Sequence, residues 1–281
     1  MFGNPASLEF TETQKRRLTE LGGKNFLDLR FLNATQREKN FDETERVLVK
    51  ENKQELLKLL KSTRRPMIRQ IERELAQALI DVGFTEVVTP SIISKEFITR
   101  MGITESHDLW KQIFWLDTRR CLRPMLAPNL YHVMRELRKF SVPISIFEVG
   151  SCFRKGSKGR EHAEEFTMLN AVELAPRKDA SERLKEIVDV SLRAVGMMNY
   201  RLQKVASEVY GETLDVVVNN IEVASGATGP HALDSNWRVI DPWAGVGFGL
   251  ERLAMVRKTC TNIGHLGRSL SHLDGSSLSV M

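Results

Sequence analysis

The segment most suggestive of chemistry combines alternate glycines with an arginine: Gly245, Gly247, Gly249 and Arg252. Glycines at every second position leave one face of a strand bare, so a flat or bulky ligand can approach the backbone. The arginine would lie one turn into the next helix and point back at that ligand. The spacing fits neither a P-loop nor a dinucleotide-binding GxGxxG turn. A strand whose glycines serve packing alone is the alternative, and this segment by itself does not decide between them.

A second arginine, Arg154, stands where an expected strand ends and a polar, basic loop begins. A guanidinium group is planar and always charged, and it can grip two phosphate oxygens at once. Arg154 therefore indicates a site for a phosphate group. Taken alone, the same segment is read more simply as a solvated hairpin tip.

Two oxygen-bearing side chains, Glu222 and Ser225, lie three residues apart on a pair of expected strands. A carboxylate and a hydroxyl could share a Mg²⁺ ion that bridges nucleotide phosphates. A lone glutamate on an edge strand usually faces water, so this signal is weak alone.

An apolar set with one amide accompanies these residues: Tyr131, Met134, Val172, Trp243 and Asn170. Asn170 and Val172 lie on the same face of an expected strand because side chains alternate along it. An amide beside aliphatic and aromatic groups could orient a large apolar ligand by its polar end. An ordinary core with one satisfied asparagine is the alternative.

Helices are expected to position these residues from the N-terminal side. Thr11 and Gln14 have the spacing of a capping box before a first helix. Residues 34–61 are rich in helix-forming side chains, with a possible break near residue 51. A third helix is expected from Pro66, a residue suited to a first helical turn.

Short β-branched and apolar runs follow, separated by turn residues. They predict strands at residues 84–89, 112–116, 144–149, 165–174, 214–218, 221–224 and 237–240. Helices are expected at 125–140 and 180–196, and again after the glycine segment. Hairpin-like loops rather than alternating strand–helix–strand units indicate an α+β fold with a mainly antiparallel sheet.

Composition limits the classes to which the protein can belong. The 281 residues contain 41 Lys and Arg against 36 Asp and Glu, and 42% are hydrophobic, which is typical of a globular protein with a sizeable core. No apolar stretch approaches the ~20 residues that span a bilayer, and no secretory signal begins the chain. The three scattered cysteines indicate a reducing cytoplasm, and no zinc spacing occurs.

The positive charge is concentrated at the N-terminal end. Residues 1–80 contain 16 Lys and Arg against 12 Asp and Glu. This is a mild bias toward polyanions, and solvated helix faces explain it equally well.

The order of these features resembles the three motifs of class II aminoacyl-tRNA synthetases: a strand ending in proline, an arginine hairpin, then a glycine strand leading into an arginine helix. Within that class the sequence resembles the catalytic domain of the pyrrolysyl-tRNA synthetase family. The matching stretches are CLRPMLAPNLY (121–131), EEFTMLN (164–170), VYGETLDV (209–216) and PWAGVGFGLERL (242–253). The resemblance implies a class II synthetase fold, with an N-terminal helical region at 1–65 and a catalytic domain at 66–281.

The resemblance also implies an ATP-dependent aminoacyl-tRNA ligase. The amino acid carboxylate attacks the α-phosphate of ATP, and the adenylate then acylates the tRNA. Arg154 and Arg252 would be catalytic, and Mg²⁺ would be held by Glu222 and Ser225. The residues that it implies for ATP binding are Arg154, His162, Phe166, Glu222, Ser225, Gly247 and Arg252.

The implied amino acid is pyrrolysine, held in an apolar pocket. Asn170 would bind the side-chain amide carbonyl, and Tyr210 would cap the pocket from a mobile loop. The residues that it implies for amino acid binding are Ala127, Leu130, Tyr131, Met134, Asn170, Val172, Tyr210, Trp243 and Gly245.

Two positions depart from the family pattern. Gly156 stands where the arginine hairpin of the family carries a glutamate that accepts the adenine amino group, so we expect weaker ATP recognition by ~0.5–1.5 kcal/mol. A neighbouring glutamate or backbone carbonyl is a possible replacement. Met134 stands where archaeal relatives carry leucine, a swap that a flexible side chain tolerates.

The implied partners are tRNA(Pyl), contacted by the N-terminal helical region, and a small tRNA-binding protein on a separate chain. A homodimer is implied through the strand that ends at Pro90. The resemblance leaves two other functions open: a catalytically weak or inactive tRNA-binding paralogue, and a related enzyme that acylates something other than tRNA.

Overall fold

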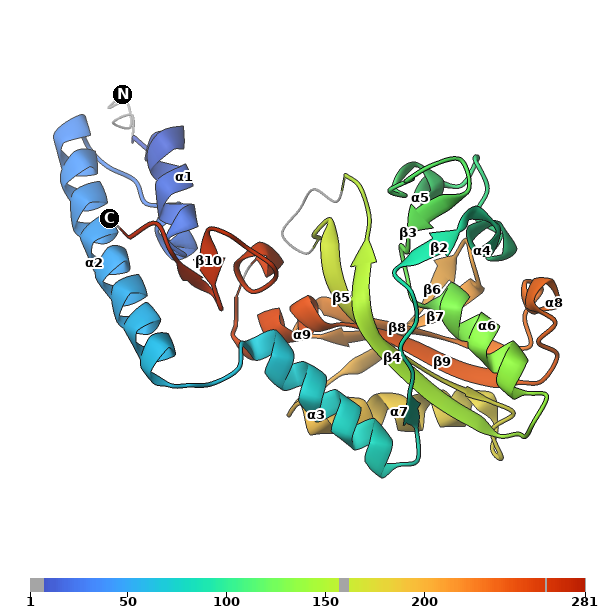
Figure 1. Ribbon diagram of the computed structural model, residues 1–281. Helices are drawn as coiled ribbons and strands as arrows, with labels where there is room; N and C mark the ends of the chain where they lie inside the picture. The colour runs from blue at the N-terminus through green and yellow to red at the C-terminus, as the bar shows by residue number, and fades with distance from the viewer. Residues whose placement is uncertain (1–7, 157–161, 261, 281) are drawn as a thin grey trace, which may run out of the picture. The chain divides into compact units, whose positions relative to one another are not determined.

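The computed structural model describes residues 8–156, 162–260 and 262–280 (Figure 1). It divides the chain into two compact units. The first contains Met1–Pro66 and Gly264–Met281, and the second contains Met67–Ile263. The N-terminal region predicted at 1–65 lies within the first unit, and the segment from Gly264, predicted as part of the catalytic domain at 66–281, belongs to that unit as well.

The first unit is built on two helices, α1 (Glu12–Glu20) and α2 (Ala34–Lys61). The capping box predicted for α1 is confirmed, because the Thr11 side chain accepts from the Gln14 backbone and the Gln14 side chain accepts from the Thr11 backbone. A short helical turn, η1 (Lys24–Phe26), and a hairpin of β10 (His272–Leu273) and β11 (Ser276–Ser277) complete this unit. Its core residues are Phe10, Leu18, Leu21, Phe31 and Leu48.

The break expected near residue 51 is wrong, since α2 runs unbroken for 28 residues. The polar residue at that place is stabilised by its neighbours. The Asn52 amide donates to the carbonyls of Leu48 and Leu21, and its oxygen accepts from the backbone of Ser277. These bonds satisfy a side chain that otherwise competes with the helical backbone.

The second unit contains a seven-stranded sheet in the order β1-β4-β5-β9-β8-β7-β6. Its strands are β1 (Thr85–Glu86), β4 (Ile144–Phe153), β5 (Glu165–Leu174), β6 (Arg201–Ser207), β7 (Gly211–Val218), β8 (Ile221–Gly229) and β9 (Trp243–Gly249). All neighbours are antiparallel except β1 and β4. The predicted α+β fold with a mainly antiparallel sheet is therefore confirmed.

Helices cover both faces of this sheet (Figure 1). On one face lies α7 (Ala180–Ala194), with α3 (Met67–Asp81) beside it. On the other face, α6 (Ala127–Leu137) packs against β4 and β5. The last helix, α9 (Leu250–Arg257), continues directly from β9. Within the described part of the chain, no helix combines the length and apolarity needed to cross a membrane.

Two expected strands are wrong. The first, at 112–116, follows the short helix α5 (Asp108–Lys111) and makes only one isolated bridge, from Trp115 to Cys121. Its partner segment β3 (Arg120–Leu122) pairs instead with β2 (Ile92–Ser94), before the helix α4 (Lys95–Arg100). Short apolar runs do not distinguish strands from other buried segments, so packing decided the outcome here.

The second, at 237–240, is occupied by the end of a helical turn. The turn is α8 (Asp234–Trp237), and Arg238 after it has a left-handed backbone with a φ of 57°. The buried Trp237 ring gave this stretch its apolar character, yet it packs against Tyr131 rather than pairing in a sheet.

Candidate active site

The strand register brings the predicted polar residues into one row across the sheet. Asn170 on β5 lies opposite Gly247 on β9, which lies opposite Ser225 on β8. Ser225 in turn lies opposite Asp215 on β7. Residues directly opposite on neighbouring strands point to the same face. The row therefore places an amide, a hydroxyl and a carboxylate on one face, with a glycine gap between the amide and the hydroxyl.

The glycines of β9 leave space for a ligand on this face of the sheet. A Cβ atom at Gly247 would lie 3.0 Å from the Met168 Cε and 3.4 Å from the Asn170 Oδ1. A Cβ atom at Gly245 would lie 3.3 Å from the Trp243 ring. Any side chain here would fill the space beside Asn170, so the glycines serve an open floor rather than packing alone.

An apolar cavity of about 430 Å³ lies over this floor. Its walls come from α6, β5, β9 and the turn between β6 and β7. Every residue predicted for amino acid binding lines it: Ala127, Leu130, Tyr131, Met134, Asn170, Val172, Tyr210, Trp243 and Gly245. The structure thus brings together residues that are up to 118 positions apart in the sequence.

A buried carboxylate that was not predicted from the sequence accepts hydrogen bonds from two side chains that line this cavity. Asp234 is 2% exposed and accepts hydrogen bonds from the Tyr131 hydroxyl and the Trp243 indole N–H, both at 2.8 Å. It also accepts from the backbone N–H of His231 at 2.6 Å. Burial, Tyr210 and Asp234 together raise the pKa of Tyr131, so its hydroxyl stays a donor.

Tyr210 closes the cavity on one side. It lies between β6 and β7, with its ring centroid 5.9 Å from that of Trp243 in an edge-on contact. Its backbone carbonyl contacts the His231 ring nitrogen. Burial raises the pKa of Tyr210, so the ring stays neutral.

Asn170 has the only amide among the predicted pocket residues. It is partly buried at the cavity floor. Within the ranges that the structure describes, its side chain has no hydrogen-bond partner. A partly buried amide with free bonding capacity is suited to a polar group of a ligand.

A second cavity, of about 250 Å³, adjoins the first. All the residues predicted for ATP binding line it: Arg154, His162, Phe166, Glu222, Ser225, Gly247 and Arg252. The two cavities share as lining residues Arg154, Met168, Glu222, Ser225 and Gly247. The two cavities therefore adjoin, and Arg154 lines both of them.

Arg154 is oriented from two sides. Its Nε donates to the carbonyl of Pro124 at 2.9 Å, and its guanidinium lies 5.4 Å from the ring centroid of Phe166. Burial and the nearby charge of Arg252 lower the pKa of Arg154, although an arginine stays charged at neutral pH. Two adjacent guanidinium groups at one cavity favour an anionic ligand.

Arg252, on the first turn of α9, is held by β8. Its Nη1 donates to the carbonyl of Glu222 at 3.0 Å and pairs with the Glu222 carboxylate at 2.9 Å. His162 lies exposed at the rim of the second cavity. The rest of the predicted basic loop, 157–161, lies outside the described residues.

The residues predicted to bind Mg²⁺ offer oxygen atoms only, as this hard cation prefers. Ser225 donates to the carboxylate of Asp215 at 2.6 Å, and Glu222 reaches the same cavity. In the described ranges, no cluster of three or more His, Cys, Asp or Glu side chains is suited to a metal. The donor set is therefore two carboxylates and a hydroxyl, which suits a cation that is also held by substrate phosphates.

Two further carboxylates of the second unit were not predicted from the sequence, for different reasons. Asp215 is a polar residue inside an otherwise apolar strand, a signal that was available. Glu251, beside Arg252, is 2% exposed and accepts the backbone N–H of Thr167 with both oxygens, at 2.9 and 3.0 Å. It lines the second cavity and ties the start of β5 to α9.

The two departures from the family pattern have clear positions. Gly156 has a left-handed backbone with a φ of 70°, and its N–H lies 3.5 Å from the Glu164 carboxylate. Glu164 is therefore a neighbouring glutamate of the kind named above as a replacement for the acceptor that Gly156 lacks. Met134 is buried and lines the apolar cavity.

Comparisons with known proteins found matches over most of the chain. The family described as phenylalanyl tRNA synthetase beta chain CLM domain matches residues 54–227. The crystal structure of pyrrolysyl-tRNA synthetase from Desulfitobacterium hafniense is 44% identical with a TM-score of 0.91, covering 97% of this chain and 99% of that chain. A second structure of a pyrrolysyl tRNA synthetase from this organism is 44% identical with a TM-score of 0.90, covering 98% and 99%. The chain therefore belongs to the pyrrolysyl-tRNA synthetase family of aminoacyl-tRNA ligases.

Proposed function

We propose that the protein activates pyrrolysine with ATP and transfers it to tRNA(Pyl). The observation that carries this proposal is the pair of joined cavities, one apolar and one lined by two arginines, which share Arg154 as a lining residue. Activation needs an amino acid carboxylate and an α-phosphate side by side. The relatives that match nearly the whole chain bear the name pyrrolysyl-tRNA synthetase.

The apolar cavity suits a long, mostly apolar side chain with one amide. Asn170 would donate to the amide carbonyl of the substrate, and the aromatic walls Tyr131 and Trp243 would enclose the ring. Since an apolar wall separates ligands by ~1–3 kcal/mol per methylene, we expect other bulky Nε-acyl lysines to be accepted.

Adenylate formation follows from the placement of the two arginines. The substrate carboxylate attacks the α-phosphorus, its new P–O bond replaces the bond to the β-phosphate, and pyrophosphate leaves. Arg154 would bind the α-phosphate and the attacking carboxylate, and Arg252 would bind the outer phosphates. Such groups act by orientation and by stabilising the charge that develops at the transition state. Phe166 would stack on the adenine ring.

Glu222 and Ser225, together with Asp215, would hold Mg²⁺. When bound, the ion would neutralise phosphate charge. The Glu222 carboxylate pairs with Arg252, so both side chains are held at the phosphate cavity.

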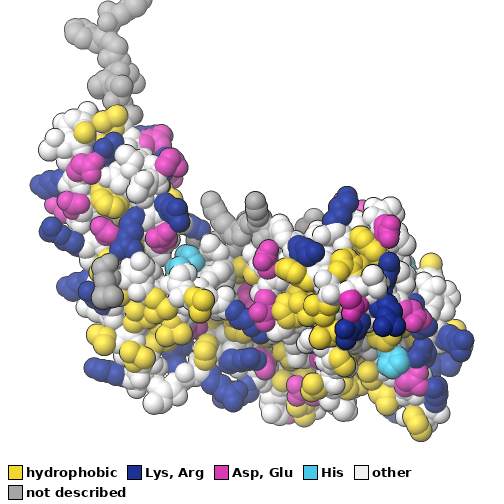
Figure 2. Space-filling view, turned by 45° about the horizontal axis from the view of Figure 1, so that its top comes forward, with side chains coloured by type: hydrophobic (Ala, Val, Ile, Leu, Met, Phe, Trp, Pro, Cys, Tyr) yellow, Lys and Arg dark blue, Asp and Glu magenta, His cyan; other side chains and the backbone are white. Residues whose placement is uncertain are grey.

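Transfer to tRNA needs a ribose hydroxyl at the same point. The hydroxyl oxygen forms an ester bond with the acyl carbon of the adenylate. The bond between that carbon and the phosphate oxygen breaks, AMP leaves with the electron pair of that bond, and the hydroxyl proton passes to a phosphate oxygen or to water. We place the tRNA contact in the N-terminal region 1–65, which is mildly basic. On the face shown in Figure 2, its Lys and Arg side chains alternate with Asp and Glu rather than forming one patch, so contact with a few phosphates is proposed.

Further partners and the location are proposed as well. A homodimer is supported by apolar side chains left exposed beside Pro90: Ile80, Val82 and Val88. A separate small tRNA-binding protein is proposed from the resemblance alone. The cytoplasm is proposed because all three cysteines are free.

Pyrophosphate exchange tests the activity. With pyrrolysine or Nε-Boc-lysine, the protein should exchange label from pyrophosphate into ATP. Arg154→Ala and Arg252→Ala should each abolish exchange. Arg257→Ala is the matched control, since Arg257 lies on the same helix as Arg252 but pairs with Glu74 and lines neither cavity.

Two outcomes would contradict the proposal. Wild-type exchange rates in either cavity variant would show that the arginines do not act on ATP. Tight tRNA binding without any nucleotide binding at millimolar ATP would instead identify an inactive paralogue.

A further inference from the structure

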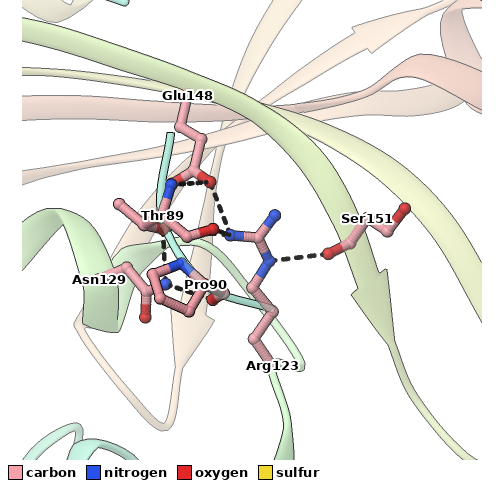
Figure 3. Close-up of polar contacts among 6 residues, drawn as sticks. All are labelled: Thr89, Pro90, Arg123, Asn129, Glu148 and Ser151. Carbon is pink, nitrogen blue, oxygen red and sulfur yellow. Dashed lines mark hydrogen bonds and ion pairs between the residues drawn. The ribbon is translucent and has the colours of Figure 1, made fainter. Parts of the chain in front are cut away.

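A buried ion pair lies beside the active site but lines neither cavity. Arg123 and Glu148 are 3% and 1% exposed, and the Arg123 Nη1 lies 2.6 Å from the Glu148 carboxylate. Figure 3 shows that this pair stands at the centre of a polar network with Thr89, Pro90, Asn129 and Ser151.

The network gives both charges several polar partners. The Glu148 carboxylate also accepts from the Thr89 N–H at 3.1 Å and the Thr89 hydroxyl at 2.7 Å. The Nε of Arg123 donates to the carbonyl of Ser151 at 2.8 Å. Its Nη1 also reaches the Thr89 carbonyl at 3.2 Å. The guanidinium is thus fixed between β4 and the segment after β1.

The backbone around Arg123 is hydrogen-bonded directly to the strand end that carries Arg154. The carbonyl of Arg123 accepts from the N–H of Phe153 at 3.0 Å. The next carbonyl, that of Pro124, accepts from the Nε of Arg154 at 2.9 Å. The guanidinium of Arg123 therefore anchors the segment whose carbonyl sets the direction of Arg154.

The same network reaches the amino acid cavity. The amide of Asn129, on the first turn of α6, donates to the Thr89 hydroxyl at 2.6 Å and to the Pro90 carbonyl at 2.9 Å. The next two residues of that helix, Leu130 and Tyr131, line the cavity. Stability alone does not explain such a network, because apolar residues of similar volume often stabilise a fold as well as a buried ion pair does.

We propose that Arg123 is a positioning residue for adenylate formation, acting through the Pro124 carbonyl on the guanidinium of Arg154. Arg123 does not touch the substrates. The proposal rests on the proposed function of the joined cavities. It predicts a defect in the rate of the chemical step rather than in the folding of the protein.

Arg123→Lys tests the proposal. A lysine keeps the charge opposite Glu148, but its single nitrogen cannot occupy both the Nε position that bonds Ser151 and the Nη1 position that bonds Thr89. The rate constant of adenylate formation is measured in a single turnover with saturating ATP and Nε-Boc-lysine. This rate constant does not depend on the fraction of the protein that is folded and active. We expect a fall of about tenfold or more, because small misplacements of catalytic groups are costly. The KM for ATP should change less than about twofold.

Gly150→Ala disturbs the same guanidinium without removing it. A Cβ atom at Gly150 would lie 1.9 Å from the Arg123 Nη2, so the arginine must shift. We expect the same loss of rate. Arg183→Lys is the matched control, since Arg183 pairs with Glu173 at 2.7 Å, with side chains 20% and 8% exposed, on the other face of the sheet. It should alter thermal stability while leaving the rate constant within about twofold.

A double substitution tests the route. In an Arg154→Lys background the guanidinium is gone, so Arg123→Lys should lower the remaining rate less than about twofold. A further tenfold loss there, or wild-type rates in both Arg123→Lys and Gly150→Ala, would overturn the inference. If the wild-type protein forms no adenylate, the proposed function itself fails, and the two failures are thereby distinguished.

Discussion

Asp234 controls the amino acid cavity although it belongs to none of the motifs. One of its oxygens accepts from Tyr131 and the other from Trp243, so a single carboxylate sets two walls. A carboxylate can accept from several donors at once, whereas an amide has only one acceptor atom. The identity of residue 234 therefore matters to the shape of the cavity.

Asp234→Asn should weaken amino acid binding selectively. One buried donor loses its acceptor, which costs about 1–3 kcal/mol, so we expect the KM for the amino acid to rise roughly 5- to 100-fold. The KM for ATP should stay unchanged in pyrophosphate exchange. Asp241→Asn is the control, since Asp241 pairs with Arg138 and lines neither cavity. Equal rises in both KM values would contradict this role.

A substitution at Gly156 is expected to improve the recognition of ATP. Gly156→Glu introduces the acceptor that the family resemblance implies at this position, and we expect the KM for ATP to fall about 2- to 10-fold, equivalent to one added hydrogen bond. The backbone there has a φ of 70°, which side chains other than glycine rarely adopt, so the gain is reduced by strain.

Gly156→Ala isolates that strain from the carboxylate, because no atom lies within 4 Å of a Cβ at this position. It should raise the KM for ATP or leave it unchanged. A similar fall in the alanine variant would show that the carboxylate is not the cause.

At the scale of elements, the tail of the first unit carries an unusual pair of rings. His265 stacks on His272 of β10, with ring centroids 3.9 Å apart and planes 10° apart. His272 is held in turn by the carbonyl of Glu20 at the end of α1. Burial, His272 and Lys24 lower the pKa of His265 to about 4.

The stability of this unit should fall in acid. A lowered pKa means that the unfolded chain binds more protons between about pH 6.5 and pH 4, so stability is present above that window and is lost as pH falls through it. Hydrogen exchange of residues 264–280 should therefore quicken between pH 7 and pH 5, after correction for intrinsic rates. His265→Gln should flatten this dependence, and an unchanged profile would exclude His265 as the cause.

At the scale of the whole molecule, the exposed apolar residues near β1 predict self-association. Val88 is 90% exposed next to the buried network of Thr89, with Ile80 and Val82 exposed just before it. Large exposed apolar side chains that gather in one short stretch indicate an interface. If this stretch forms the dimer contact, the interface lies one residue away from the network that orients Arg154.

Val88→Asp should weaken the dimer by more than about tenfold in dissociation constant, since a charge would be buried without a partner. Sedimentation over a range of concentrations measures this directly. Leu270→Asp is the control, because Leu270 is fully exposed in the first unit. A wild-type protein that sediments as a monomer at all concentrations would contradict the dimer.

Local signals in the sequence were sufficient to predict several elements of this protein. The capping box at Thr11, the strand at 165–174 and the glycine segment at 243–249 are set by neighbouring residues, and each was predictable. The cavity residues were predicted because long motif stretches resemble one family.

Only the tertiary structure decided the rest. The row from Asn170 to Asp215 depends on strand register, and the contacts of Asp234 and Arg123 join segments far apart in the chain. A buried polar residue gives no periodic signal in the sequence, because its role depends on which partners the packing places beside it. The expected strands at 112–116 and 237–240 failed for the same reason, since an apolar run specifies burial but not the element that is buried.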